Sequence, residues 1–499
     1  MKKAFSALII LGMIFILYDV VFAVDPVPDI IANNSNGTIN ITPSDNLSVT
    51  VELNPGSYSG NSADWWLAVE TTEGWYYYDF DRREGEWVYA PSPDNVLVTH
   101  QGPLFGLSKY EVVNISGLPA GTYVVYFGVD MNMNGLLDFD KLYYDSVSIM
   151  SGPPAVPYEW IISAIDSAGD VGEHTSIAID SINKVHISYR DDNNNDLKYI
   201  TNTAGTWKSS IIDNSVIVGD NPTSIAADSN NKAHIAYHEN TNVDLKYATN
   251  ASGVWVTSTV DSAGWVGHYP SIAVDSENKA HISYENYSFS AYDLKYATNA
   301  SGSWIASTID TEGGSHSSIA VDSNNKIHIS YEVNASQNER LKYTTNASGP
   351  WTAYNIDTAV EIDDTSVAID SNNKAHISYH ACLNEDAGHN CTNGVLKYAT
   401  NAAGSWTTYT IDIIGTGGIV GEFSSIALDT NDKVHIAYYD RTNGDLKHAT
   451  NSSGSWVASI VDSEGDVGWY CSIAVGPDDK VHISYHDSAT DDLKYATNR

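Results

Sequence analysis

Histidines, carboxylates and aromatic residues recur at corresponding places in a repeated pattern of this 499-residue sequence. One set comes just before a recurring Ser-[Ile/Val]-Ala motif and comprises Glu173, His174, His268, Tyr269, His316, Asp363, Asp364, Glu422, Trp469 and Tyr470. A second set follows the Tyr of a recurring His-Ile-[Ser/Ala]-Tyr motif and comprises Arg190, His238, Glu285, Glu332, His380, Tyr439 and His486. Side chains of these types can supply acid and base groups to a carbohydrate or acyl substrate. The alternative is that they are ordinary polar residues on variable surface loops.

The histidine inside the second motif is present in every repeat, which predicts a structural role. These residues are His186, His234, His281, His328, His376, His435 and His482. An identical residue in each repeat serves something that all repeats share, so we expect a hydrogen bond between strands or between repeats. The Trp that opens each repeat is expected to fill the core in the same way.

A separate motif near the N-terminus has the oxygen-bearing side chains of a calcium loop. Its residues are Asp130, Asn132, Asn134, Asp138 and Asp140. With Gly135 at the sixth position, they match the start of an EF-hand-type loop. The twelfth position is Lys141 instead of a bidentate Glu, and the flanks alternate like strands, so we expect weak, stabilising Ca²⁺ binding. The alternative is an Asn-Gly hairpin turn with incidental acids.

The elements that must position the first two sets follow from the repeat. Its opening residues are Trp160, Trp207, Trp255, Trp304, Trp351, Trp406 and Trp456, spaced 47 to 55 residues apart. Each period holds four short segments rich in β-branched and aromatic residues, which is typical of a β-propeller blade. Residues 160–166 supply one strand before the first full repeat, and residues 472–498 supply three after the last. We therefore expect an all-β, seven-bladed propeller closed by strands from both ends of the array, which leaves no open sheet edge.

The motif series Ser-Ile-Ala, Lys-x-His-Ile-Ser-Tyr, Leu-Lys-Tyr-Ala-Thr-Asn and Trp resembles secreted BNR-like propellers of the sialidase-superfamily type. The resemblance covers residues 158–499. It implies the propeller fold, whereas lectins, lyases, hydrolases and adhesins all carry such repeats. The sialidase Asp-box, Ser-x-Asp-x-Gly-x-Thr-Trp, is replaced here by segments such as 249–255, which lack the Asp. This departure argues against sialidase activity.

The connections between the expected strands differ in uniformity. Turns such as residues 229–231 and 251–253 are nearly constant and fit tight hairpins. The connections expected on the opposite face vary in length and chemistry, up to the insertion at residues 382–393. Because functional loops diversify while scaffold loops stay uniform, we expect the functional site on the variable face. Neutral drift of surface loops is the alternative.

The region before the repeats predicts a separate unit. Residues 1–23 have the basic start, apolar stretch and small-residue cleavage site of a secretory signal. Residues 24–150 alternate like strands and favour a small Ig-like β-sandwich, joined by a Pro/Gly-rich linker at residues 151–157 to the propeller at residues 158–499. In an oxidising compartment Cys382 and Cys391 are close enough in sequence to form a disulfide.

The composition restricts the partners. With 62 acidic and 25 basic residues, the net charge is −37, which argues against binding nucleic acid or an anionic membrane surface. No segment after the signal has the length and apolar character of a membrane span.

We expect a secreted or cell-surface monomer whose variable face binds a glycan or a surface protein without catalysis. The alternatives are a carbohydrate-active enzyme, either a glycoside hydrolase or a polysaccharide lyase, with its site at the channel mouth, and a structural surface-layer or matrix component. Ca²⁺ is the one cofactor that the sequence suggests.

Overall fold

The computed structural model describes residues 25–43, 45–71, 74–80, 86–137, 142–152, 158–215, 217–218, 221–288, 291–334, 339–386, 390–414, 417–454 and 456–499. The expected signal, residues 1–23, lies outside these ranges, as do residues 153–157 of the expected linker. Strands dominate, with two short 3-10 helices, η1 (Gly56–Tyr58) and η2 (Pro93–Asn95). None of the helices in the described ranges has the length and apolar character needed to cross a membrane.

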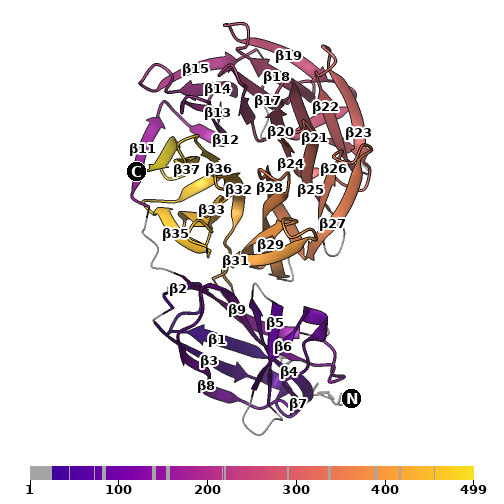
Figure 1. Ribbon diagram of the computed structural model, residues 1–499, viewed down its shortest axis with the longest axis vertical. Coiled ribbons are helices and arrows are strands. Elements are labelled where there is room, and N and C mark those ends of the chain that lie inside the picture. Colours follow the sequence, from indigo (N-terminus) through magenta and orange to yellow (C-terminus); the bar gives the residue numbers. More distant parts are fainter. Residues whose placement is uncertain are drawn as a thin grey trace, which may run out of the picture.

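The repeats fold into four-stranded antiparallel sheets, and Figure 1 shows these sheets around a common centre. Sheet 1 contains β12 (Val171–Ile179), β13 (Val185–Asp191), β14 (Asp196–Thr201) and β15 (Lys208–Asp213). Sheet 2 contains β16 (Ser224–Ala227), β17 (Ala233–Glu239), β18 (Asp244–Thr249) and β19 (Val256–Asp261). Sheet 3 contains β20 (Trp265–Val274), β21 (Ala280–Ser288), β22 (Ala291–Thr298) and β23 (Ile305–Asp310). Sheet 4 contains β24 (Ser315–Val321), β25 (Ile327–Val333), β26 (Glu339–Thr345) and β27 (Thr352–Ala359).

The remaining sheets follow the same pattern. Sheet 5 contains β28 (Glu361–Ile369), β29 (Ala375–Glu385), β30 (Cys391–Thr400) and β31 (Thr407–Asp412). Sheet 6 contains β32 (Glu422–Leu428), β33 (Val434–Asp440), β34 (Asp445–Thr450) and β35 (Val457–Asp462). Sheet 7 combines β36 (Val467–Val475), β37 (Val481–Asp487) and β38 (Asp492–Asn498) with β11 (Trp160–Asp166) from the other end of the array. Each first strand contacts the first strand of the next sheet, and β12 contacts β36. The prediction of an all-β, propeller-like fold is confirmed.

Serine hydroxyls link the first strands of neighbouring sheets. The Ser of each Ser-[Ile/Val]-Ala motif accepts a hydrogen bond from a backbone N–H in the next sheet. For example, Ser176 accepts from Ile225 at 3.2 Å, and Ser472 of sheet 7 accepts from Ile177 of sheet 1 at 3.3 Å. The recurrence of this Ser therefore has a physical cause: it satisfies a buried donor of the neighbouring sheet.

A second hydroxyl contact lies beside the first one. At five junctions the Ser of His-Ile-Ser-Tyr contacts a Ser or Thr of the next sheet, as Ser188 contacts Thr223 at 2.8 Å. At the other two junctions Ala236 and Ala437 occupy the first position. The partner positions there hold Pro270 and Cys471 in place of a hydroxyl. The two positions thus change together, because a lone buried hydroxyl would lose its partner.

Aspartates at the ends of outer strands connect each sheet to the following one. Asp261 of sheet 2 accepts a hydrogen bond from the Tyr284 hydroxyl of sheet 3 at 2.6 Å and pairs with Lys295. The same Asp–Tyr–Lys arrangement recurs at every junction. The Lys ammonium also lies over the Tyr ring, 5.5 Å from its centroid in sheet 3. Because these tyrosines are fully buried, the carboxylate is the natural partner for each hydroxyl.

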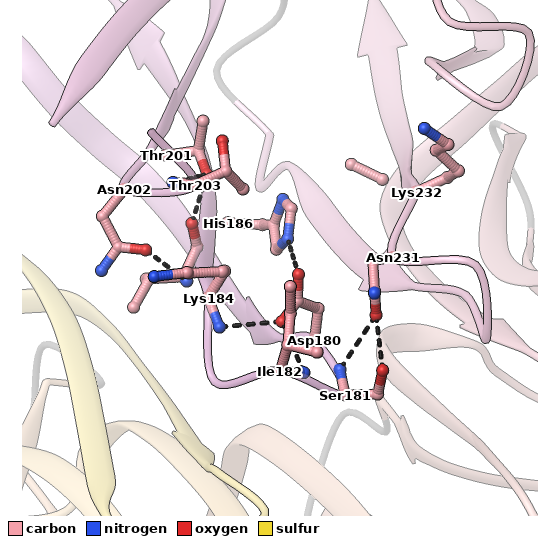
Figure 2. Close-up of polar contacts among 12 residues, drawn as sticks. Asp180, Ser181, Ile182, Lys184, His186, Thr201, Asn202, Thr203, Asn231 and Lys232 are labelled. Carbon is pink, nitrogen blue, oxygen red and sulfur yellow. Dashed lines mark hydrogen bonds and ion pairs between the residues drawn. The ribbon is translucent and has the colours of Figure 1, made fainter. Parts of the chain in front are cut away.

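The histidines repeated in every sheet are structural, as the sequence predicts. His186 Nδ1 lies 2.6 Å from the Tyr199 hydroxyl. Its Nε2 lies 3.2 Å from Asp180, as Figure 2 shows. Asp180 also accepts the backbone N–H groups of Ile182 and Lys184, which fixes the turn after β12. In sheet 6 the tyrosine is replaced by His448, whose Nε2 lies 3.1 Å from His435 Nδ1.

The N-terminal region contains two sheets that share one core. One sheet contains β1 (Val27–Ala32), β3 (Asn46–Asn54) and β8 (Leu107–Ser116). The other contains β2 (Ile39–Ile41), β4 (Ser62–Thr71), β5 (Gly74–Asp79), β6 (Glu86–Ala90), β7 (His100–Pro103), β9 (Gly121–Asp130) and β10 (Leu142–Ser151). Val49 and Leu53 of the first sheet pack with Trp65 and Phe127 of the second.

The N-terminal region also docks on the outer strand of sheet 5, and β2 lies beside β31 in Figure 1. The Thr38 hydroxyl donates to Asp412 at 2.5 Å, and its N–H donates to the Ile413 carbonyl at 3.0 Å. Met150 packs in a core cluster with residues of sheets 5 and 6.

Replacing Tyr284 by Phe tests the contribution of one junction. We expect the free energy of unfolding to fall by about 1.5–3 kcal/mol, because a buried hydrogen bond to a charged group is lost. Chemical denaturation of the variant and the parent measures this difference. Tyr354→Phe is the control, since Tyr354 is 44 % exposed, and its effect should stay within about 0.5 kcal/mol. Equal effects of both substitutions would contradict the assignment.

Candidate functional site

The segments that enter the first strands fix side chains at the channel mouth. In every sheet except sheet 2, a register shift interrupts the pairing of the first and second strands two or three residues before the motif Ser, as between Glu173 and Ser176. In six sheets the residue at this bulge has a positive φ of 44° to 54°; these residues are His174, Tyr269, His316, Asp364, Phe423 and Tyr470. Non-glycine residues adopt this conformation at a cost, and such strain often accompanies functional sites.

Close packing against the preceding sheet holds these segments in place. A Cβ on Gly267 would lie 2.7 Å from Leu245 Cα, and one on Gly314 would lie 2.5 Å from Leu294 Cα. Only glycine allows this approach of two backbones, which places the next residues at the mouth. His174, Tyr269, His316, Asp364 and Tyr470 line a central cavity of about 180 Å³.

A larger groove of about 540 Å³ opens beside the channel over sheets 3 and 4. Its polar side is formed by His268, Glu285, His316 and Glu332. Its aromatic side is formed by Trp265, Tyr269, Tyr287 and Tyr292. The Trp265 and Tyr287 rings stack with centroids 5.5 Å apart and planes 9° apart, and Trp265 is 47 % exposed. Figure 1 places the strands that carry them, β20 and β21, next to β24 and β25.

A histidine with two carboxylates lies where the groove meets the channel. His316 Nδ1 forms a very short contact with Glu332 Oε1 and lies 3.7 Å from Asp363 Oδ1. Burial opposes the charged imidazole, but Glu332, with Asp364 and Asp363 contributing, raises the pKa of His316 to about 10. Burial, with Glu332 and Asp364 adding to it, raises the pKa of Asp363 to about 9. At neutral pH the arrangement therefore combines a protonated carboxyl with an imidazolium.

Two further acids border this cluster. Glu285 accepts a hydrogen bond from the Ser315 hydroxyl at 2.6 Å, and burial raises its pKa. Glu339 accepts the Ile362 N–H at 3.0 Å, and burial raises its pKa to about 7. The described residues that line the groove include no Lys or Arg, and Glu285 and Glu332 outnumber the His316 imidazolium, so the groove disfavours anionic ligands.

The structure gathers Glu173, Arg190 and His486 at a different place, the junction of sheets 7 and 1. Arg190 Nε lies 2.7 Å from Asp192 Oδ1, and its Nη1 lies 4.0 Å from Glu173 Oε2. Burial, with Asp192 adding to it, raises the pKa of Glu173 to about 8. His486 Nε2 lies 4.0 Å from Asp170 Oδ1. These residues are not grouped with the His316 cluster.

A third group lies on sheets 6 and 7. Trp469 Nε1 donates to Asp466 at 3.0 Å, and the Tyr439 hydroxyl donates to the same oxygen at 2.5 Å. Glu422 pairs with Arg441 at 3.1 Å; burial raises the pKa of Glu422 and Arg441 opposes this shift.

His238 and His380 are buried. The His238 ring lies against His268 with centroids 4.3 Å apart and planes tilted by 32°, and burial, with His268 adding to it, lowers the pKa of His238 to about 3. His380 is 2 % exposed, and burial lowers its pKa to about 4. Neither histidine is placed to meet a ligand directly.

Part of the calcium motif is described. The Asp130 carboxylate accepts the Asn132 N–H at 2.9 Å, and the Gly135 N–H donates to Asp64 at 2.6 Å. Asp138 and Asp140 lie outside the described residues. In sheet 5 a disulfide joins Cys382 to Cys391.

Several groove residues were missed by the sequence analysis. Aligning the repeats on their Val-Gly dipeptide places Trp265 at the same position as Asp170 and Asp466, two residues before the Gly. That alignment would have identified all three as residues of a variable position on the same face. Tyr287 and Tyr292 lie on the β21–β22 hairpin, which is longer than the corresponding hairpins of sheets 1 and 2. Its Tyr-rich extension was the available signal.

Comparison with known proteins finds similarity only among solved structures. No protein-family model and no curated protein matches the chain. An ulvan lyase of polysaccharide lyase family PL25 is 10 % identical, with a TM-score of 0.46, covering 68 % of this chain and 94 % of that one. An AofleA mutant from Arthrobotrys oligospora is 14 % identical, with a TM-score of 0.42, covering 62 % and 90 %. A leech intramolecular trans-sialidase is 10 % identical, with a TM-score of 0.36, covering 88 % and 92 %.

Replacing Glu332 by Gln tests the ion pair. We expect the pKa of His316 to fall from about 10 toward its ordinary value, because the main charge that stabilises the imidazolium is removed. Histidine side-chain ¹⁵N NMR over pH 6 to 11 measures the titration, and His316→Asn assigns the signal. Because the folded pKa is raised, the ion pair stabilises the parent fully below about pH 6.5, and this stabilisation is lost as pH rises through about 10. An unchanged titration in Glu332→Gln would contradict the pairing.

Proposed function

We propose that this protein is a secreted carbohydrate-active enzyme that hydrolyses a neutral glycan in the groove over sheets 3 and 4. The observation that carries the proposal is the position of the His316–Glu332–Asp363 cluster beside an aromatic wall. Groups whose surroundings shift their pKa values strongly, in a cleft that can hold a ligand, are typical of catalytic sites.

The groove supports a sugar ligand on three counts. Its volume of about 540 Å³ lies within the range of small-molecule sites. The stacked Trp265 and Tyr287 expose an apolar face, which suits the C–H face of a sugar ring. Glu285 and Glu332 line the groove, whose described lining residues include no Lys or Arg, and this acidic lining disfavours uronates and sulfated sugars. This last point favours hydrolysis of a neutral chain over lyase chemistry on an acidic one.

The residues divide the acid–base work. Asp363, held protonated by its surroundings, gives its proton to the leaving glycosidic oxygen as the bond to the anomeric carbon breaks. A water supplies the hydroxyl to that carbon, and its proton passes to the Glu285 carboxylate. His316, positioned by Glu332, donates a hydrogen bond to the substrate. The Ser315 hydroxyl orients Glu285.

Turnover of neutral polysaccharides tests the proposal. We expect reducing ends to be released from at least one of a panel of glucans, mannans, xylans and galactans. Asp363→Asn should lower kcat about 10²- to 10⁴-fold, because the proton donor is lost. Trp265→Ala should raise the dissociation constant for the same glycan about tenfold, because the stacking face is lost. Asp478→Asn, in the exposed turn between β36 and β37, is the matched control and should leave both quantities unchanged.

The second candidate is glycan recognition without catalysis, which the exposed Trp265–Tyr287 stack would support by itself. Binding that depends on Trp265, with no release of reducing ends by the parent protein, would favour this candidate. Absence of both binding and turnover across the panel would contradict both functions.

We further propose that the sheets form a closed propeller of seven blades and that residues 24–150 form a separate sandwich domain. Supporting closure, β11 pairs with β38 and β12 contacts β36. We also propose that residues 1–23 direct secretion and that the protein is a monomer.

Ca²⁺ binding at the loop that begins with Asp130 remains a prediction with a direct test. We expect Ca²⁺ to raise the Tm of the full chain by a few degrees, because the ion binds the folded loop and not the unfolded one. Asp130→Asn should abolish this rise, as measured by differential scanning calorimetry. Mg²⁺ is the control ion. A rise that persists in Asp130→Asn would place the ion elsewhere.

A further inference from the structure

We infer that the junction between sheet 7 and sheet 1 holds a divalent transition-metal ion, ligated by Asp170, His486 and Asp491. This inference is independent of the proposed hydrolase function, because the three residues lie outside the groove over sheets 3 and 4.

The geometry brings three ligand atoms together. One atom each from Asp170, His486 and Asp491 lies within 4.8 Å of the others. His486 Nε2 lies 4.0 Å from Asp170 Oδ1, which is too long for a hydrogen bond. Two ligands of one tetrahedral ion lie roughly 3–3.5 Å apart, so small side-chain rotations would complete the site.

The buried imidazole supplies the independent observation. His486 is 4 % exposed, and its Nε2 has no hydrogen-bond partner among the described residues. The same holds for the buried Oδ1 of Asp170. Buried polar atoms almost always have a partner, and an ion between these two atoms would satisfy both.

The backbone holds the three ligands without need of the ion. His486 lies near the end of β37, paired with Trp469 of β36 and Leu493 of β38. Asp491 lies in the turn before β38 with a φ of 57°, and its carbonyl accepts the Val171 N–H at 3.0 Å. Asp170 immediately precedes Val171. The ligands therefore come from both ends of the repeat array.

The donor set indicates the kind of ion. One imidazole nitrogen and two carboxylates suit Zn²⁺ and similar ions better than Ca²⁺, which prefers six or more oxygen ligands. Burial lowers the pKa of His486, which keeps the imidazole in its ligating, neutral form. Burial, with Asp491 and Asp192 adding to it, raises the pKa of Asp170, so the carboxylates gain from a cation. Arg190 is committed to Asp192 at 2.7 Å and to Asn195 at 3.0 Å.

This junction also lacks a link that other junctions have. At six junctions a Ser or Thr in the turn after the first strand is bound by an Asn or Asp of the next sheet, as Ser181 is by Asn231 (Figure 2). In sheet 7 the corresponding residue is Pro477, which has no hydroxyl and no N–H to donate. Asp170, His486 and Asp491 lie at the other end of the strands from this turn, so the ion would add a link to the same junction without replacing the missing one.

The test is Zn²⁺ binding to the full chain after treatment with a chelator. Isothermal titration calorimetry should show one site, and Zn²⁺ should raise the Tm. Asp491→Asn should weaken binding at least about tenfold and remove the rise in Tm. This variant is expected to fold, because Asp491 is exposed and Asn tolerates its positive φ.

Two control variants locate the ion. Asp192→Asn removes a carboxylate of the neighbouring acidic group, and His316→Asn removes the histidine of the groove, so both should bind Zn²⁺ like the parent. Anomalous scattering at the zinc edge from a crystal should place the ion on His486. Binding that survives in Asp491→Asn but is lost in either control variant would overturn the inference, as would the absence of binding by the parent.

Discussion

The structure depends on the hydrogen bonds and ion pairs that cross from each sheet to the next. A propeller-like ring gains little from contacts within one sheet, because a four-stranded sheet cannot bury both of its faces alone. The Ser-to-backbone bonds near the centre and the Asp–Tyr–Lys groups farther out both cross the junctions. Apolar residues fill the space between these two levels, as Ile272 and Tyr284 do in sheet 3. Polar links and apolar packing therefore act together at each junction.

The same framework allows the residues at the start of each first strand to vary in type. Glycines such as Gly314 fix the backbone against the preceding sheet, and the motif Ser fixes it again slightly further along the chain. The residues between them vary from His316 to Phe423 without changing the strand pairing that follows. In sheets 4 and 5 these entrances supply His316 and Asp363, which join Glu332 from the end of a second strand, and in other sheets they supply aromatic or ion-paired groups.

Much of the fold could be predicted from the sequence, because the spacing of the recurring motifs gives the length of one sheet. Each recurring residue also makes the same kind of contact in every sheet. The structural role of His186 and its equivalents followed from that uniformity. The grouping of the variable residues could not be predicted, because it depends on which neighbours face each other across a junction. His316 meets Glu332 from the same sheet and Asp363 from the next, whereas Glu173 meets Arg190 at another junction. Trp265 was missed because its position does not recur, being Asp170 and Asp466 in two other repeats and Ile419 in a third.

The presence of Ala236 opposite Pro270, where other junctions have two hydroxyls, has an evolutionary consequence. Tandem repeats are prone to homogenisation, in which one copy overwrites another. Such an event could place a serine at position 236, where its hydroxyl would face Pro270. It could also place an alanine at position 188, where the Thr223 hydroxyl would lose its hydrogen-bond partner. Selection against these mismatches would keep the sequences of neighbouring repeats different from one another. The paired positions at the junctions therefore limit how far the repeats can become identical.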